Sequence, residues 1–216
     1  MKKTTLLLSA ITLATGLLST QAQAVEGLSA NAAIGSNYIW RGLTQTDDQA
    51  AVSGGIDYEA ASGFYAGTWV SNVDFGDDTN SELDLYLGYG FEAGDFAFDF
   101  GYLSYIYSGG DDLDFSEIYA SVNWDFLTVG YNLLADSDYG SDFGDDGYIY
   151  ADLAFEVSKD LELGLHIGNS NYDGGGDYVD YGISLSKNNF TFAITDTDID
   201  GDDVNFSISY SIDIDL

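Results

Sequence analysis

The thirteen residues at the end of the chain constrain its fold most strongly. From Val204 to Leu216 every second residue is apolar, and serine, asparagine or aspartate fills each place between. A β-strand directs successive side chains to opposite faces, so one face of this segment is apolar and the other is polar. The segment is longer than the usual ~5–6 residues of a soluble strand and suits a tilted membrane-crossing strand of roughly 9–11 residues. An amphipathic strand of a soluble β-sandwich is the other interpretation.

The N-terminus has the features of a secretory signal peptide. Two lysines precede an apolar run over residues 6–18, and residues 22–24 form an Ala-Gln-Ala cleavage site. We therefore expect residues 1–24 to be removed and residues 25–216 to form one barrel domain. No later run approaches the ~18 apolar residues of a membrane helix, so a membrane location requires a closed barrel.

The charge of the chain excludes some partners and favours others. Of five basic residues, two lie in the predicted signal peptide, so Arg41, Lys159 and Lys187 face 37 acidic residues and the mature formal charge is −34. Such a chain repels nucleic acid and attracts cations. It contains no cysteine, which excludes disulfides and thiolate chemistry. Aromatic residues make up 15% and apolar residues 45% of the sequence, which argues against disorder.

Alternating apolar and polar residues predict twelve strands after the signal peptide. Their approximate spans are 28–41, 50–59, 64–73, 82–91, 95–106, 117–126, 127–133, 148–157, 161–167, 179–185, 190–195 and 204–216. In the first strand, Tyr38 and Trp40 fall on the same side as Ile34. The third strand has apolar residues on both sides, so its orientation stays open.

The connections between the predicted strands alternate between short and long. Short turns near residues 59–63, 92–95, 126, 158–160 and 186–189 alternate with longer loops rich in Asp, Gly and Asn, the first at 42–49. This alternation is typical of bacterial outer-membrane barrels, and it predicts an all-β, antiparallel transmembrane β-barrel of about twelve strands with short periplasmic turns and longer acidic extracellular loops. Aromatic residues of lipid-facing parity beside the short turns predict an interfacial girdle: Phe91, Phe96, Trp124, Phe126 and Phe190.

Several runs in the first third of the chain resemble a known family. They are Asn37-Tyr38-Ile39-Trp40-Arg41-Gly42-Leu43, Val52-Ser53-Gly54-Gly55-Ile56, Gly63-Phe64-Tyr65-Ala66-Gly67-Thr68-Trp69 and Glu82-Leu83-Asp84-Leu85-Tyr86. The order resembles the proteobacterial TorF porin family, once described as a family of unknown function. The resemblance is specific over about residues 28–89 and architectural beyond, and it implies an outer-membrane barrel. The chain ends in Leu216, whereas many outer-membrane barrels end in an aromatic residue.

Residues on the polar side of the strands form the predicted pore lining. They are Arg41, Asp57, Glu82, Asp84, Tyr86, Asp99, Glu117, Tyr119, Asp152, Glu156, Glu162, His166 and Asp180. Carboxylates around a pore favour cations. The alternative is an interior filled by hydrogen-bonded side chains, because twelve strands lie between the filled eight-stranded barrels and the open channels of 16–18 strands.

Arg41 is the single arginine of the mature chain, and it has inward parity near the loop end of the first predicted strand. We hypothesise that it pairs with lumen carboxylates, such as Glu82 or Asp84, and narrows or tunes the mouth of the pore. A purely structural ion pair is the alternative.

The last long loop carries half of an EF-hand pattern. Asp196, Asp198, Asp200 and Asp202 have the spacing of its first ligands, but the twelfth position is Ser207 rather than glutamate. A complete EF-hand is therefore not expected. We hypothesise that this acidic loop binds calcium or magnesium loosely and that, at the cell surface, such ions bridge to lipopolysaccharide phosphates. No other cofactor is expected, and a solvated loop is the alternative.

His166 is the single histidine, and it lies on the same strand face as Glu162. No G-x-S-x-G motif or other acid–base spacing accompanies it, so we expect no enzymatic activity.

Together these features predict a porin of the cell outer membrane, in contact with outer-membrane lipid and lipopolysaccharide, through which small, preferentially cationic solutes diffuse passively. One rival is a non-conducting barrel whose acidic loops bind divalent cations or partners. Another is a soluble periplasmic β-protein, which cell fractionation distinguishes from a barrel. No pattern identifies a subunit interface, so the oligomeric state stays open.

Overall fold

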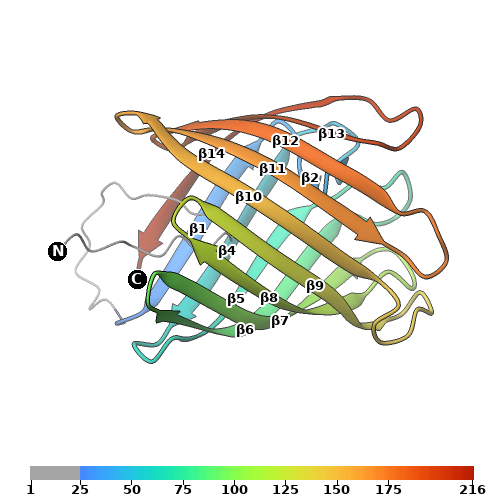
Figure 1. Cartoon of the computed structure of the whole chain (residues 1–216). Coiled ribbons are helices and arrows are strands. Elements are labelled where there is room, and N and C mark those ends of the chain that lie inside the picture. The colour runs from blue at the N-terminus through green and yellow to red at the C-terminus, as the bar shows by residue number, and fades with distance from the viewer. Residues whose placement is uncertain (1–24) are drawn as a thin grey trace.

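The computed structural model describes residues 25–216, and the predicted signal peptide lies outside this range. The described chain forms a closed barrel of twelve antiparallel strands (Figure 1). The wall strands are β1 (Leu28–Gly35), β4 (Ala51–Glu59), β5 (Phe64–Asn72), β6 (Ser81–Ala93), β7 (Phe96–Ser108), β8 (Phe115–Trp124), β9 (Leu127–Ser137), β10 (Gly147–Ser158), β11 (Leu161–Asn171), β12 (Tyr178–Lys187), β13 (Phe190–Thr197) and β14 (Asn205–Asp215). The predicted fold class is confirmed.

Each wall strand pairs with its neighbour in sequence, and the barrel closes where β1 pairs with β14 as well as with β4. Both ends of the described chain lie at the end of the barrel that carries the short turns (Figure 1). There the N–H of Val25 donates to the carbonyl of Leu216 at 2.6 Å. Asp125, Asp160 and Asn188 adopt positive φ in the short turns, a conformation that Asp and Asn tolerate. The longer connections lie at the opposite end, as predicted.

Apolar side chains cover the outside of the barrel, and polar side chains point inward. On β6, Leu83, Leu85 and Leu87 are 38%, 42% and 58% exposed, whereas Glu82 and Asp84 are 1% and 9% exposed. A soluble sandwich buries its apolar rows between two sheets, and this chain does the opposite. Among residues 25–216, no helix is long and apolar enough to cross a membrane.

The five predicted girdle residues are all exposed on the outer wall near the short turns. Phe96 stacks on Trp124 with ring centres 6.2 Å apart, and Phe190 packs against Tyr210 at 4.9 Å. Aromatic rings at this level match the position of a membrane–water interface.

The prediction for the first strand is wrong beyond Gly35. The chain leaves the wall there, and β2 (Ile39–Trp40) pairs with β3 (Leu43–Thr44) in a separate two-stranded sheet. We call residues 38–45 the lumen hairpin, because Tyr38, Trp40 and Arg41 contact inward-facing side chains of the wall. Tyr38 and Trp40 therefore do not continue the outward-facing row of Ile34.

The lumen hairpin forms because its two central residues suit a tight turn. Arg41 and Gly42 have φ values of 48° and 83°, the positive pair that a two-residue type I′ turn requires. At the base, the side-chain oxygen of Asn37 accepts hydrogen bonds from the hydroxyls of Thr44 at 2.7 Å and Thr46 at 2.9 Å. A short inner hairpin and a long wall strand share the period of two residues, so alternation alone does not separate them.

The outward orientation of the apolar side chains on the wall strands can be tested by substitution. Replacing Ile208, which is exposed on the outside of β14, with arginine should cost about 2–4 kcal/mol because the charge would lie in hydrocarbon. The matched control is Ser209→Arg, since Ser209 lines the polar interior, where an arginine would stay out of hydrocarbon. Denaturant unfolding in lipid vesicles measures both; an equal cost for the two variants would contradict the assigned orientation.

Candidate functional site

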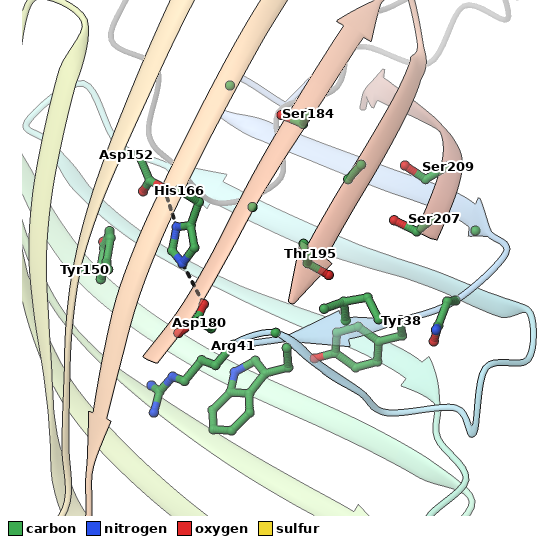
Figure 2. A pocket seen from close by; sticks show the side chains of 18 of the residues that line it. Tyr38, Arg41, Tyr150, Asp152, His166, Asp180, Ser184, Thr195, Ser207 and Ser209 are labelled. Atoms are coloured by element: carbon green, nitrogen blue, oxygen red, sulfur yellow. Dashed lines mark hydrogen bonds and ion pairs between the residues drawn. The ribbon is translucent and has the colours of Figure 1, made fainter. Parts of the chain in front are cut away.

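The interior of the barrel is divided into a filled side and an open side. Inward positions of β11–β14 carry small residues, namely Gly164, Gly182, Ser184, Ala193, Thr195, Ser207, Ser209 and Ser211. Beside them lies a cavity of about 710 Å³ (Figure 2). The open space follows from residue size, because the side chains at these eight positions are too small to fill it.

Tyrosines and carboxylates fill the other side. The hydroxyl of Tyr65 donates to Asp99 at 2.8 Å and contacts the hydroxyl of Tyr119. Glycines make room for the rings: a Cβ atom at Gly88 would collide with Tyr65, and one at Gly101 would collide with Tyr119. Alternating glycine and tyrosine on neighbouring strands therefore packs this side without widening the barrel.

The lumen hairpin crosses between the two sides. The Tyr38 hydroxyl donates to Glu82 at 2.7 Å, and the Tyr38 ring contacts Trp69 with centres 5.3 Å apart. Burial, and then the nearby Glu82 carboxylate, raise the pKa of the Tyr38 phenol well above its ordinary value, so the phenol stays protonated and donates. Trp40 packs edge-on against Tyr105 at 6.0 Å.

Arg41 pairs with a predicted lumen carboxylate, Glu117, rather than with the two given as examples. Its Nη2 lies 2.7 and 2.8 Å from the two carboxylate oxygens of Glu117, and it forms no ion pair with Glu82 or Asp84. The partner differs because Arg41 lies on the lumen hairpin, whose tip reaches β8 rather than β6. Burial alone would lower the pKa of Arg41, but the Glu117 carboxylate reverses the shift and raises that pKa, so the guanidinium remains charged.

The tip of the hairpin also contacts the open side of the barrel. Asn205 of β14 donates from Nδ2 to the carbonyl of Gly42 at 3.1 Å. A Cβ atom at Gly42 would collide with the side chains of Asp180 and Thr197, so this position requires glycine for space as well as for its positive φ. The lumen hairpin is therefore held from opposite walls.

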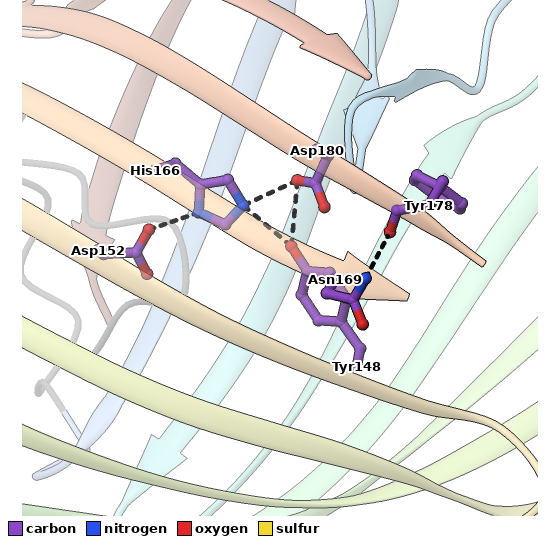
Figure 3. Close-up of polar contacts among 6 residues, drawn as sticks. All are labelled: Tyr148, Asp152, His166, Asn169, Tyr178 and Asp180. Carbon is purple, nitrogen blue, oxygen red and sulfur yellow. Dashed lines mark hydrogen bonds and ion pairs between the residues drawn. The ribbon is translucent and has the colours of Figure 1, made fainter. Parts of the chain in front are cut away.

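A histidine cluster borders the cavity on β10–β12 (Figures 2 and 3). His166 Nδ1 lies 2.6 Å from Asp152 and its Nε2 lies 2.8 Å from Asp180, with the Tyr148 hydroxyl 2.9 Å from Nε2. Carboxylates accept hydrogen bonds, so an imidazolium with two N–H groups satisfies both contacts. Glu162, the neighbour considered from the sequence, makes none of these contacts.

The structure distributes the predicted lining residues over three zones. Arg41, Asp152, His166 and Asp180 line the cavity. A second group belongs to the filled side: Asp57, Glu82, Asp84, Tyr86, Asp99, Glu117 and Tyr119. Glu156 and Glu162 lie directly opposite each other on β10 and β11, next to a short turn. Their role in lining a conducting pore stays a prediction.

Sequence reasoning missed the aromatic and hydroxyl residues of the cavity. Tyr38, Trp40 and Trp69 line it together with the small residues of β11–β14. The signal for the open side was present, since small residues repeat at inward positions over four successive strands. No sequence pattern distinguished the lumen hairpin from a continuation of the first wall strand.

The carboxylates of the predicted metal loop make local hydrogen bonds. Asp196 accepts from the Tyr181 hydroxyl at 3.0 Å, Asp198 from the Val179 N–H at 2.7 Å, and Asp202 from the Thr197 hydroxyl at 2.6 Å. No group of three or more His, Asp or Glu side chains within residues 25–216 is arranged to hold a metal ion. Loose binding of calcium or magnesium by this loop, including Asp200, stays a prediction.

Comparisons with known proteins agree with a porin-type barrel. Residues 19–214 match the family described as "Bacterial protein of unknown function (Gcw_chp)". The solved structure of a KdgM porin aligns with a TM-score of 0.60 at 11% identity, covering 87% of this chain and 99% of its own. A KdgM porin in complex with disordered oligogalacturonate aligns with a TM-score of 0.54 at 10% identity, covering 86% and 95%. These identities show the fold alone. No curated protein sequence matches the chain. The resemblance to the TorF family stays a prediction.

The packing of the hairpin tip can be tested at Gly42. Gly42→Ala should lower the free energy of unfolding more than Gly76→Ala by about 1–3 kcal/mol, because both glycines have positive φ but only Gly42 is crowded. Gly76 lies in an outer loop, where an added methyl group would have nothing within 4 Å. Denaturant titration in micelles measures the difference, and equal costs would show that the tip does not pack against β12 and β13.

Proposed function

Because the chain belongs to the Gcw_chp family, whose function is unknown, we propose its function from the barrel and its interior. We propose a porin of the cell outer membrane through which small, preferentially cationic solutes diffuse passively. The observation that carries the proposal is a cavity of about 710 Å³ inside a barrel whose outer wall is apolar. The likeness to KdgM porin in fold supports a channel, and no catalytic activity is expected.

The charges inside the barrel support the preference for cations. Arg41 and His166 are each engaged with inward carboxylates, whereas Lys159 lies exposed in a short turn and Lys187 at the end of β12. Inward carboxylates therefore outnumber inward cations, and their field favours cations over anions. Oligogalacturonate, named with a KdgM porin, is a polyanion, and we expect this interior to oppose such a solute.

The open side of the interior supplies the proposed path. Solutes would pass between the lumen hairpin and the serine, threonine and glycine residues of β11–β14. Hydroxyl groups on this side replace water around a solute without holding it by charge, which suits passage better than binding.

One observation favours a second candidate, a non-conducting barrel. The lumen hairpin contacts both sides of the interior, through Arg41 with Glu117 and through Gly42 with Asn205. A barrel closed in this way would act through its acidic outer loops, which would bind divalent cations and through them lipopolysaccharide. Conductance separates the two candidates.

Ion selectivity tests the porin. In planar bilayers with a potassium chloride gradient, we expect single-channel currents whose reversal potential has the sign of cation selectivity. If the chain inserts into the bilayer but produces no current, the non-conducting barrel is favoured. A reversal potential with the sign of anion selectivity would contradict the role of the carboxylates.

The path can be tested by filling it. Ser184→Trp should reduce single-channel conductance at least about twofold, because Ser184 lines the cavity and the large indole ring would fill part of its volume. The matched control is Leu185→Trp on the same strand, since Leu185 is exposed on the outer wall. Unchanged conductance in Ser184→Trp, or equal loss in both variants, would exclude the proposed path.

A further inference from the structure

Two aromatic rings and a carboxylate surround the planar guanidinium of Arg41. Its guanidinium carbon lies 4.2 Å from the ring centre of Trp40 and 4.1 Å from that of Tyr148. Nη2 reaches both oxygens of Glu117, and the side chains of Arg41 and Glu117 are 9% and 5% exposed. Two aromatic faces and a buried carboxylate are the groups that hold guanidinium most strongly.

The wall holds most of this site without help from the hairpin. Glu117 Oε2 also accepts from Asn132 Nδ2 at 2.9 Å and from the Tyr105 hydroxyl at 3.2 Å. Tyr105 is itself fixed by stacking on Phe115 with ring centres 4.2 Å apart. Because wall residues orient the carboxylate, we expect it to keep its position when Arg41 is absent.

We propose that Tyr105, Glu117, Asn132 and Tyr148 form a binding site in the barrel interior for guanidinium-bearing solutes, and that Arg41 occupies it as a tethered ligand. A solute of this class competes with Arg41 and releases the tip of the lumen hairpin. The role of this displacement in transport rests on the porin function proposed above. The existence of the binding site rests only on the contacts of Glu117.

One substitution empties the site while keeping the hairpin. Arg41→Asn creates Asn-Gly, the sequence that type I′ turns prefer, so the positive φ at both positions is retained. The asparagine side chain is too short to replace the guanidinium at Glu117. Arg41→Asn combined with Glu117→Gln is the matched control, because it also removes the carboxylate.

The first measurement is thermal unfolding of the full mature chain in micelles with methylguanidinium at millimolar concentration. We expect a saturable rise of about 2–4 °C in the melting temperature of Arg41→Asn and a much weaker response in the wild type, where Arg41 already occupies the site. Tetramethylammonium at the same ionic strength has no N–H donors and should give no rise, and the double variant should lose the response. An equal response in single and double variants, or none, would overturn the site.

The second measurement uses the wild type, so the inference does not depend on the folding of a variant. The Gln45 N–H donates to the Tyr38 carbonyl across the hairpin at 2.7 Å. Methylguanidinium, but not tetramethylammonium, should speed hydrogen exchange of this amide as it displaces Arg41. Unchanged exchange at saturating concentration would contradict displacement. Neither measurement requires conduction, so the two proposals can fail separately. A chain that gives no current in bilayers but responds to methylguanidinium would contradict the porin function and support the binding site. A chain that conducts but does not respond to methylguanidinium would support the porin function and contradict the binding site.

Discussion

Closure of β1 onto β14 is the contact on which the rest of the molecule depends. Lipid offers no hydrogen bonds to the backbone, so each strand edge within the membrane needs a partner. The pairing from Ser29 with Asp215 to Gly35 with Ser209 removes the last free edges. Once the ring is closed, the apolar residues face outward and the inward residues share one enclosed space, whose contents then decide what the barrel does.

That enclosed space is built from two size classes of side chain. Tyrosine rings matched to glycines pack the side of β5–β8, while serine, threonine and glycine leave the side of β11–β14 open. The lumen hairpin lies between them and carries the one arginine of the described chain to Glu117. The balance between an open and a closed interior therefore depends on a segment of a few residues rather than on the number of strands.

The sequence contained enough information for the wall and too little for the hairpin. Alternation in segments such as Leu83–Phe91 sets which side chains point outward, and loop lengths set which end of the barrel carries the short turns, so both were predictable. Alternation also continues through Tyr38 and Trp40, although these residues leave the wall, because a tight hairpin keeps the same period. The partner of Arg41 lies 76 residues away in sequence and is determined by the closed ring, which no local pattern encodes.

The contacts of the hairpin tip also bear on how the barrel assembles. Asn205, which donates to the Gly42 carbonyl, is 163 residues further along the chain and belongs to β14, the last wall strand in chain order. Contacts across such a separation form late, because a long loop must close first. Because the contact with Gly42 and the pairs that close the ring belong to the same strand, β14, we expect the narrowing of the interior and the closure of the barrel to be completed together.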